Sequence, residues 1–238
     1  MASRVDNENS TRQRRIRGLV MFSGAQGDDS VAAQLRALGM EVDEIDNLIG
    51  GASHNMLKMR RRMEIINAVR AGEYDVIWMA PPCGTWSVVR EPPLRSGKMI
   101  NGLDGLSDED KLKVKHANEL AQLVAVVAHT AEAAGVPWFI EQPADRGDEA
   151  SDAHWEGLMD PPHMFKMPFF KVLQDVVQPT VVTFPQCALG AAVQKYTSIM
   201  GSKSTHDLLQ VFNELRCTHQ HHEERIKGVD ERGQLRSA

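Results

Sequence analysis

The sequence has little cysteine, few aromatic residues and no long hydrophobic run: it contains three cysteines, and aromatic residues make up 5% of the chain. Three widely separated cysteines argue against a disulfide framework and favour a reducing compartment. No stretch is apolar over the roughly 20 residues that a membrane-spanning helix needs, so we expect no membrane partner. Residues 1–18 also lack the apolar core of a signal peptide, and we therefore expect an intracellular protein, cytoplasmic or nuclear.

An excess of positive charge is also missing. The formal net charge is −5, so the surface as a whole would not attract nucleic acid. Hydrophobic residues at 42% and charged residues at 25% are ordinary for a globular protein, and 238 residues fit one large domain. Basic residues nevertheless gather in two clusters, which we interpret as solvated surface, with a nucleic-acid contact as the alternative. The clusters are Arg12, Arg14, Arg15 and Arg17, and Lys58, Arg60, Arg61 and Arg62.

Strand-like and helix-like segments alternate along the chain. This alternation predicts an α/β fold of the Rossmann-like, doubly wound kind, with a mainly parallel sheet covered on both faces. We expect a disordered basic tail over 1–16, the α/β domain over 17–215 and a polar C-terminal tail over 216–238. The predicted strands are 19–22, 40–45, 74–79, 136–140, 180–184 and 196–200; the predicted helices are 29–38, 55–70, 109–134 and 204–215, with 150–175 irregular to helical.

Local features add detail to these segments. Asp28 or Asp29 would cap the helix over 29–38. Residues 88–108 are too many for a simple connection and predict a functional or mobile loop. The side of the helix over 55–70 that we expect to face inward consists of Met56, Met59, Met63, Ile66 and Val69.

Four positions with chemical potential fall where predicted strands end. A small-residue turn follows Phe22, and Asp46 stands at the tip of the second strand. The loop around Cys83 follows the third strand, and Glu141 ends the fourth. Because ligands of parallel sheets bind beyond the carboxyl ends of the strands, we expect one site to collect these residues.

The turn after the first strand contains Gly24 and Gly27. Glycine lets a ligand approach the backbone, and the N-terminus of the following helix favours a carboxylate or phosphate. Asp46 lies about 20 residues further on, where a carboxylate can accept hydrogen bonds from two ribose hydroxyls. The alternative is a tight turn with a capping aspartate.

Cys83 and Glu141 are the candidate reactive groups. Two prolines stiffen the chain before Cys83, and a nearby cation or helix N-terminus would lower the pKa of its thiol and make it nucleophilic. The alternative for Cys83 is a small buried hydrophobic residue. Glu141 ends a mostly apolar strand, where partial desolvation suits a proton donor; the alternative is a solvent-facing glutamate.

Four motifs, in this order, resemble the cytosine-C5 methyltransferases: VMFSGAQG, the acidic strand tip at Asp46, APPCGTWS and FIEQP. They are similar to that family's cofactor loop, its ribose-binding acid, its Pro-Cys nucleophile motif and its Glu-Asn-Val-type motif. The likeness is closer to a divergent group of methyltransferase-like proteins from protists and mobile elements, in which segments similar to VVREPPLRSGKMINGLDGL and VKHANELAQLV follow. The resemblance covers approximately residues 18–200 and implies the S-adenosylmethionine methyltransferase type of Rossmann-like fold.

The resemblance also implies a mechanism and a set of site residues. Cys83 would attack C6 of a cytosine that has left its stack, and Glu141 would stabilise or protonate N3. C5 would then take a methyl group from S-adenosylmethionine, with DNA favoured over RNA as the partner. Asn55 lies near where the family often places an acid against the adenine amino group. The cofactor residues would be Phe22, Gly24, Gly27, Asp46, Asn55 and Pro81; Ser87, Arg90 and Arg95 would bind phosphate or the flipped base, or else form a solvated loop.

Two departures from the family pattern leave alternatives open. The second motif reads Glu-Gln-Pro in place of Glu-Asn-Val, and the chain has little room for a target-recognition domain. Sequence specificity would then come from an additional subunit or domain. The chain could instead be a non-catalytic module that binds cofactor or nucleic acid within a larger or mobile-element protein. A third possibility is another S-adenosylmethionine enzyme that uses the same loop on a different substrate.

The C-terminal part contains the run CTHQHH. Structural zinc sites use such ligands, but usually with tighter, paired spacing. We therefore interpret the run as a plain polar tail and predict no metal site. A zinc site is the alternative, and its four ligands would be Cys187, Cys217, His219 and His222.

Overall fold

Six strands form one sheet in the computed structural model, which describes residues 14–24, 26–220 and 222. The strand order is β2-β1-β3-β4-β6-β5. Neighbours from β2 to β4 pair in parallel, whereas β6 runs antiparallel to both β4 and β5. The sheet is therefore mixed and mostly parallel, which confirms the predicted α/β class. The strands are β1 (Arg17–Met21), β2 (Glu41–Ile45), β3 (Val76–Met79), β4 (Trp138–Pro143), β5 (Thr180–Pro185) and β6 (Tyr196–Gly201).

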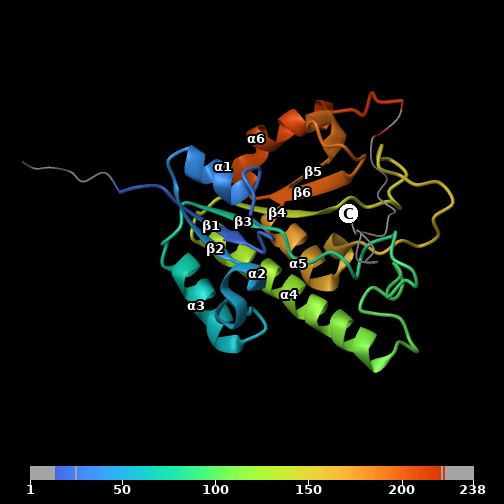
Figure 1. The fold of residues 1–238 in the computed structure, drawn as a ribbon, viewed down its shortest axis with the longest axis horizontal. Coiled ribbons are helices and arrows are strands. Elements are labelled where there is room, and N and C mark those ends of the chain that lie inside the picture. The colour runs from blue at the N-terminus through green and yellow to red at the C-terminus, as the bar shows by residue number, and fades with distance from the viewer. Residues whose placement is uncertain (1–13, 25, 221, 223–238) are drawn as a thin grey trace, which may run out of the picture.

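Helices cover both faces of the sheet. Figure 1 shows α1 and α6 on one face and α3, α4 and α5 on the other. The long helix α4 contacts both α3 and α5, and Ser107 caps it by accepting a hydrogen bond from the backbone N–H of Asp110 at 3.1 Å. The helices are α1 (Val31–Ala37), α2 (Asn47–Gly50), α3 (Met59–Arg70), α4 (Asp108–Ala133), α5 (Pro168–Val177) and α6 (His206–Gln210); short 3-10 helices span Gly51–His54, Met164–Lys166, Gln186–Leu189, Lys203–Thr205 and Val211–Glu214.

Side chains of β4 alternate between two hydrophobic clusters. Trp138 and Ile140 belong to the larger cluster, which α3, α4 and α5 cover, and Phe139 belongs to the smaller one beside α6. Successive residues of a strand face opposite sides of the sheet. The same alternation directs Glu141 to the α6 face and Gln142 to the α4 face.

The parallel pairing of β2, β1, β3 and β4 ends in one row of residues. Met21 pairs with Ile45 on one side and with Met79 on the other, and Met79 pairs with Ile140. All four side chains are buried. The loops that follow these residues therefore leave the sheet at the same level, and this alignment positions the candidate site.

Two predicted strand ends are wrong, each for a local reason. The first strand ends at Met21 and not at Phe22, because Phe22 adopts a φ of 61°, which lies outside the β region. The strand predicted to end at Ile140 continues to Pro143, because its last three residues pair with the antiparallel β6.

The helix predicted over 55–70 begins at Met59, since a short helix and a 3-10 turn occupy residues 47–54. The inward orientation predicted for Met59 and Met63 is wrong: they are 67% and 43% exposed. Arg62 takes the position toward α4 and forms a 2.7 Å ion pair with Glu119. The predicted inward residues that are buried are Met56, Ile66 and Val69, joined by Ile65.

Two further helix predictions are wrong in detail. Ser30 caps α1 in place of Asp28 or Asp29, because a turn closed by Ser30 N and Gly27 O precedes the helix. The helix expected over 204–215 is reduced to α6 and 3-10 turns. Thr205 donates its hydroxyl proton to Ser202 O at 2.8 Å, a local bond that competes with helix formation.

Residues 88–107 form the long irregular loop that the sequence predicts. None of the helices in the described ranges combines the length and hydropathy that crossing a bilayer requires. The chain segments 1–13 and 223–238, which make up most of the two predicted tails, lie outside the described residues.

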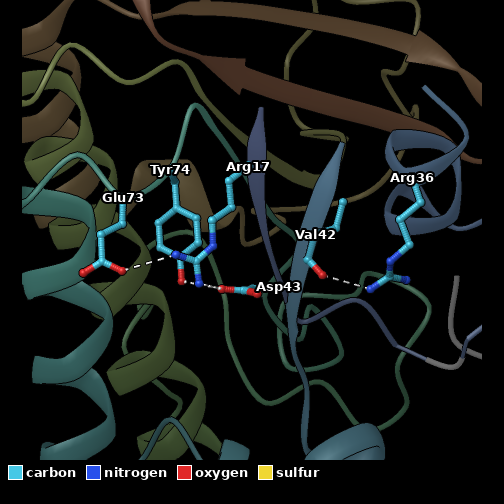
Figure 2. Close-up of polar contacts among 6 residues, drawn as sticks. All are labelled: Arg17, Arg36, Val42, Asp43, Glu73 and Tyr74. Carbon is cyan, nitrogen blue, oxygen red and sulfur yellow. Dashed lines mark hydrogen bonds and ion pairs between the residues drawn. The ribbon is translucent and has the colours of Figure 1, made fainter. Parts of the chain in front are cut away.

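A polar cluster joins the start of β1 to β2 and to the chain before β3 (Figure 2). Arg17 Nη2 lies 2.6 Å from Asp43 Oδ2 and Arg17 Nη1 lies 3.4 Å from Glu73 Oε2. The Tyr74 hydroxyl donates to the same Asp43 oxygen at 3.0 Å, beneath the Arg17 guanidinium. On the other side of β2, Arg36 donates to the carbonyl of Val42 at 3.0 Å and so covers part of the sheet edge.

Because Tyr74 is buried, we expect the free energy of unfolding to change with pH in the alkaline range. Burial, and secondarily the Asp43 carboxylate, raises the pKa of Tyr74 to about 12. An unfolded tyrosine ionises near pH 10, so the unfolded state binds fewer protons between about pH 10 and 12, and the free energy of unfolding should fall across that range. Tyr74→Phe should flatten this part of the curve in denaturant titrations. An unchanged slope in the variant would contradict the assignment.

Candidate functional site

Four residues directly follow the aligned strand ends: Phe22, Asp46, Ala80 and Glu141. The backbone N–H groups of Phe22 and Ala80 continue the sheet register by donating to the neighbouring strands at 2.8 and 3.1 Å. Three of the predicted site residues thus lie along one edge of the sheet. Cys83 follows three residues after Ala80, in a turn that Trp86 N closes onto Cys83 O at 2.8 Å.

A buried amide holds the Cys83 loop in place. Gln142 is 1% exposed, and its Nε2 donates to the carbonyl of Pro81 at 2.9 Å. Since Gln142 belongs to β4, this bond ties the loop after β3 to the end of β4, where Glu141 lies. No sequence motif gives Gln142 a role; the available signal is a second polar residue, after Glu141, at the end of an apolar strand run.

Cys83, Glu141 and Lys195 interact electrostatically. Burial raises the pKa of the Cys83 thiol; Lys195 counteracts this rise, and Glu141 adds to it. Lys195 Nζ lies 3.4 Å from Glu141 Oε1, and both side chains are largely buried. The two predicted catalytic residues therefore lie within electrostatic range of each other. It adds a cation from the chain just before β6, which no sequence motif indicates.

A cavity of about 300 Å³ opens on the α6 face of the sheet. Its wall includes Phe22 and Ser23 from the turn after β1, Trp78 from β3, and the Glu141–Lys195 pair. Ser23 Oγ is buried and has no hydrogen-bond partner among the described residues. The volume is at the lower end of those of ligand pockets, and the wall combines an aromatic surface with polar groups.

Asp46 serves two backbone groups. Its Oδ2 accepts from Gly24 N at 3.1 Å, and its Oδ1 accepts from Leu48 N at 2.7 Å, which caps α2. The capping alternative for Asp46 is thus confirmed. Gly24 has a φ of 72°, and no described atom lies within 4 Å of the position that a Cβ would take. Each carboxylate oxygen keeps a second lone pair for a ligand, and the ribose contact stays a prediction.

The other predicted cofactor residues make local contacts. Gly27 is exposed, and its carbonyl accepts from Ser30 N at 3.0 Å. Asn55 Oδ1 accepts from Leu57 N at 2.9 Å in the turn before α3. Pro81 is buried beneath Gln142. These contacts leave the proposed cofactor roles of all three residues as predictions.

Arg95 is a buried guanidinium that fastens the long loop to α4. It is 2% exposed, and it stacks on Trp86 with 3.9 Å between the guanidinium carbon and the ring centroid. Burial lowers the pKa of Arg95 to about 10. Each of its three nitrogens already has an acceptor, so its contacts indicate a positioning role, and a substrate contact stays a prediction. The acceptors are Thr85 Oγ1 at 3.1 Å, Ile100 O at 2.6 Å, Asn118 Oδ1 at 2.7 Å and Val114 O at 3.2 Å.

Arg90 and Ser87 occupy the same loop. Arg90 Nη2 lies 3.6 Å from Asp110 Oδ1 in the first turn of α4, and Arg90 N donates to Ser87 O at 3.3 Å. Their predicted substrate contacts stay predictions. In the second basic cluster, Arg60 and Arg61 pair with Glu64, and Arg62 pairs with Glu119. The exposed Arg60 fits the interpretation of a solvated helix face, whereas Arg62 packs between α3 and α4 and does not.

Removal of the cation near Cys83 and removal of the anion near it should change the reactivity of its thiol in opposite directions. Lys195→Met removes the cation, so the pKa of Cys83 should rise further and alkylation by iodoacetamide near neutral pH should slow severalfold. Glu141→Gln removes the anion and should accelerate the same reaction. Peptide mass mapping would separate Cys83 from the other cysteines, and Lys203→Met, at an exposed site, is the control. Changes of the same sign in both variants would refute the electrostatic coupling.

No known protein family matches this chain, and neither does any curated protein. The geometry around Cys83, Glu141 and Lys195 therefore carries the functional inference.

Proposed function

We propose that the chain is an S-adenosylmethionine-dependent methyltransferase that acts on cytosine C5 in nucleic acid, DNA in preference to RNA, through a covalent adduct with Cys83. The observation that supports the proposal is that Cys83, in the loop after β3, lies within electrostatic range of Glu141 in β4 and of the Lys195 ammonium that pairs with Glu141. A mostly parallel sheet with one antiparallel strand beside β4 is consistent with the methyltransferase type of fold.

The side chains of Cys83, Glu141 and Lys195 suit both the addition of a thiolate to the cytosine ring and its later expulsion. The Cys83 thiolate adds to C6 of the ring, and the displaced electron pair makes C5 nucleophilic. Glu141 stabilises the charge that develops at N3, by a hydrogen bond or a proton. S-adenosylmethionine, bound at the turn after β1, would supply an electrophilic methyl group to C5 and leave as S-adenosylhomocysteine. Loss of the C5 proton to a base then expels Cys83 as thiolate. Lys195 favours the thiolate at the start and at the end.

The turn after β1 has features that fit the cofactor. Open space at Gly24 leaves room for a ligand against the backbone. The unpartnered Ser23 Oγ and the spare lone pairs of Asp46 offer polar contacts to an amino acid and a ribose. Phe22 and Trp78 supply apolar wall in the adjoining cavity.

One observation favours the second candidate, a non-catalytic module that binds cofactor or nucleic acid. Burial dominates the environment of Cys83 and raises the pKa of its thiol, which lowers the thiolate fraction near neutral pH. A catalytic site must offset this burial when substrate binds; a binding module need not.

Calorimetry tests the cofactor site. We expect S-adenosylmethionine and S-adenosylhomocysteine to bind the purified chain, and Asp46→Asn to weaken binding about tenfold or more. Asparagine caps helices as well as aspartate does, so its Oδ1 should keep the bond from Leu48 N that caps α2. Its Nδ2 cannot accept from Gly24 N, so the variant alters the turn after β1 together with the ribose contact. Asp28→Asn, at an exposed position near the same turn, is the charge-matched control. A folded protein that binds neither ligand would remove the methyltransferase proposal.

A covalent trap tests the nucleophile. Duplex DNA that contains 5-fluorocytosine should form an adduct that survives denaturing electrophoresis when the methyl donor is present, because fluorine at C5 blocks release. Cys83→Ser should abolish the adduct, and DNA with ordinary cytosine should accumulate none. DNA retention in a gel without any adduct would favour the binding module, and an adduct with RNA alone would reassign the substrate.

A further inference from the structure

Four side chains with metal-binding chemistry meet outside the candidate methyl-transfer site. Cys187 lies in the 3-10 turn Gln186–Leu189 between β5 and β6, and Cys217, His219 and His222 follow the 3-10 turn Val211–Glu214. The fold brings the distant Cys187 to the other three. One ligand atom from each residue can be chosen so that all four lie within 4.8 Å of one another.

The separations suit a tetrahedral ion. Cys217 Sγ lies 3.3 Å from His222 Nε2 and 3.9 Å from His219 Nδ1. Bonds of about 2.3 Å to sulfur and about 2.0 Å to nitrogen place the ligand atoms of tetrahedral zinc about 3.3–3.8 Å apart. The two imidazole rings are inclined by 52°, so their nitrogens can approach one point from different directions.

The two sulfur and two nitrogen ligand atoms favour some metal ions over others. Thiolate and imidazole ligands suit zinc, whereas magnesium and calcium prefer oxygen ligands. With two sulfurs and two nitrogens, all four positions of a tetrahedral ion are filled by the protein. Such a closed site is structural, because no position stays open for water or substrate. Cys187 is 3% exposed, and the thiol of Cys217 is half-buried beside it.

We propose that Cys187, Cys217, His219 and His222 bind one structural zinc ion, which fastens the C-terminal segment to the connection between β5 and β6. A second contact joins this segment to the chain after β4: Arg216 Nε lies 2.9 Å from Asp152 Oδ2. This site is the alternative to the plain polar tail predicted over 216–238, and the fold favours it by placing the distant Cys187 beside the other three residues.

The zinc site would also help to fix the backbone position of Lys195. Gln186, next to Cys187, donates its backbone N–H to Lys195 O and its Nε2 to Thr197 Oγ1, both at 2.8 Å. The ion therefore holds a turn whose hydrogen bonds fix the backbone of Lys195. Zinc binding itself does not depend on the proposed methyl transfer, and either can fail alone.

Metal analysis of the full chain tests the site. Protein purified under reducing conditions should contain about one zinc ion per chain by mass spectrometry. Cobalt that replaces zinc should give the visible absorption of tetrahedral coordination together with a thiolate charge-transfer band. Folded, reduced protein that retains no zinc and develops no such spectrum on cobalt titration would overturn the proposal. A Cys187–Cys217 disulfide whose reduced form binds neither metal would overturn it as well.

Matched variants assign the ligands. Cys217→Ser and His222→Ala should each reduce the zinc content to about zero or abolish the cobalt charge-transfer band. Cys83→Ser and His129→Ala, which change residues outside the group, should keep about one ion. Should the ligand variants fail to fold, chelation of the wild-type protein provides the test: zinc removal should lower its Tm by several degrees, and added zinc should restore it. Retention of zinc in both ligand variants would contradict the assignment.

Discussion

The parallel pairing of β1 with β2 and β3, and of β3 with β4, fixes the candidate site, because it ends the strands at one row of buried residues. Every group assigned to the site follows that row within a few residues or contacts the end of β4. A slip of one residue in the register would exchange the two faces of a strand. Glu141 would then point into the larger hydrophobic cluster, and Gln142 would lose the carbonyl of Pro81.

Two adjacent residues near the end of β4, Glu141 and Gln142, have different roles. Glu141 faces the cavity and pairs with Lys195, while Gln142 faces the opposite side and binds the loop that carries Cys83. One strand end therefore sets both the position of the thiol and the charge beside it. The state of the thiol depends on the balance between its burial, which favours the neutral form, and Lys195, which favours the thiolate.

The sequence predicts those residues of the site that come shortly after a predicted strand. Cys83, Glu141 and Asp46 are predictable because each follows a strand-like segment, Cys83 after a short Ala-Pro-Pro connection, and parallel strands bring such ends together. Lys195 and Gln142 are not predictable in this way. Lys195 reaches Glu141 only because β6 pairs antiparallel with β4, and Gln142 reaches Pro81 only because β3 and β4 are neighbours; both contacts join residues more than 50 positions apart. Arg95 is not predictable either. An arginine in a loop is expected at the surface, but α4 and Trp86 bury this one. Whether the assembled groups bind a cofactor or transfer a methyl group stays a prediction.

The β5–β6 connection links the two proposed sites. A lysine side chain has many rotamers, and holding it in one geometry costs up to about 2 kcal/mol of entropy. The backbone of Lys195 is already fixed by Gln186, and its ammonium group by Glu141, so little of this ordering is left for substrate binding. A structural ion at Cys187 would extend that order to the C-terminal segment. The described residues after Glu214, which form no helix or strand, would then be anchored near the backbone that holds Lys195. A displaced Lys195 would leave Cys83 beside Glu141 alone and raise the pKa of its thiol further.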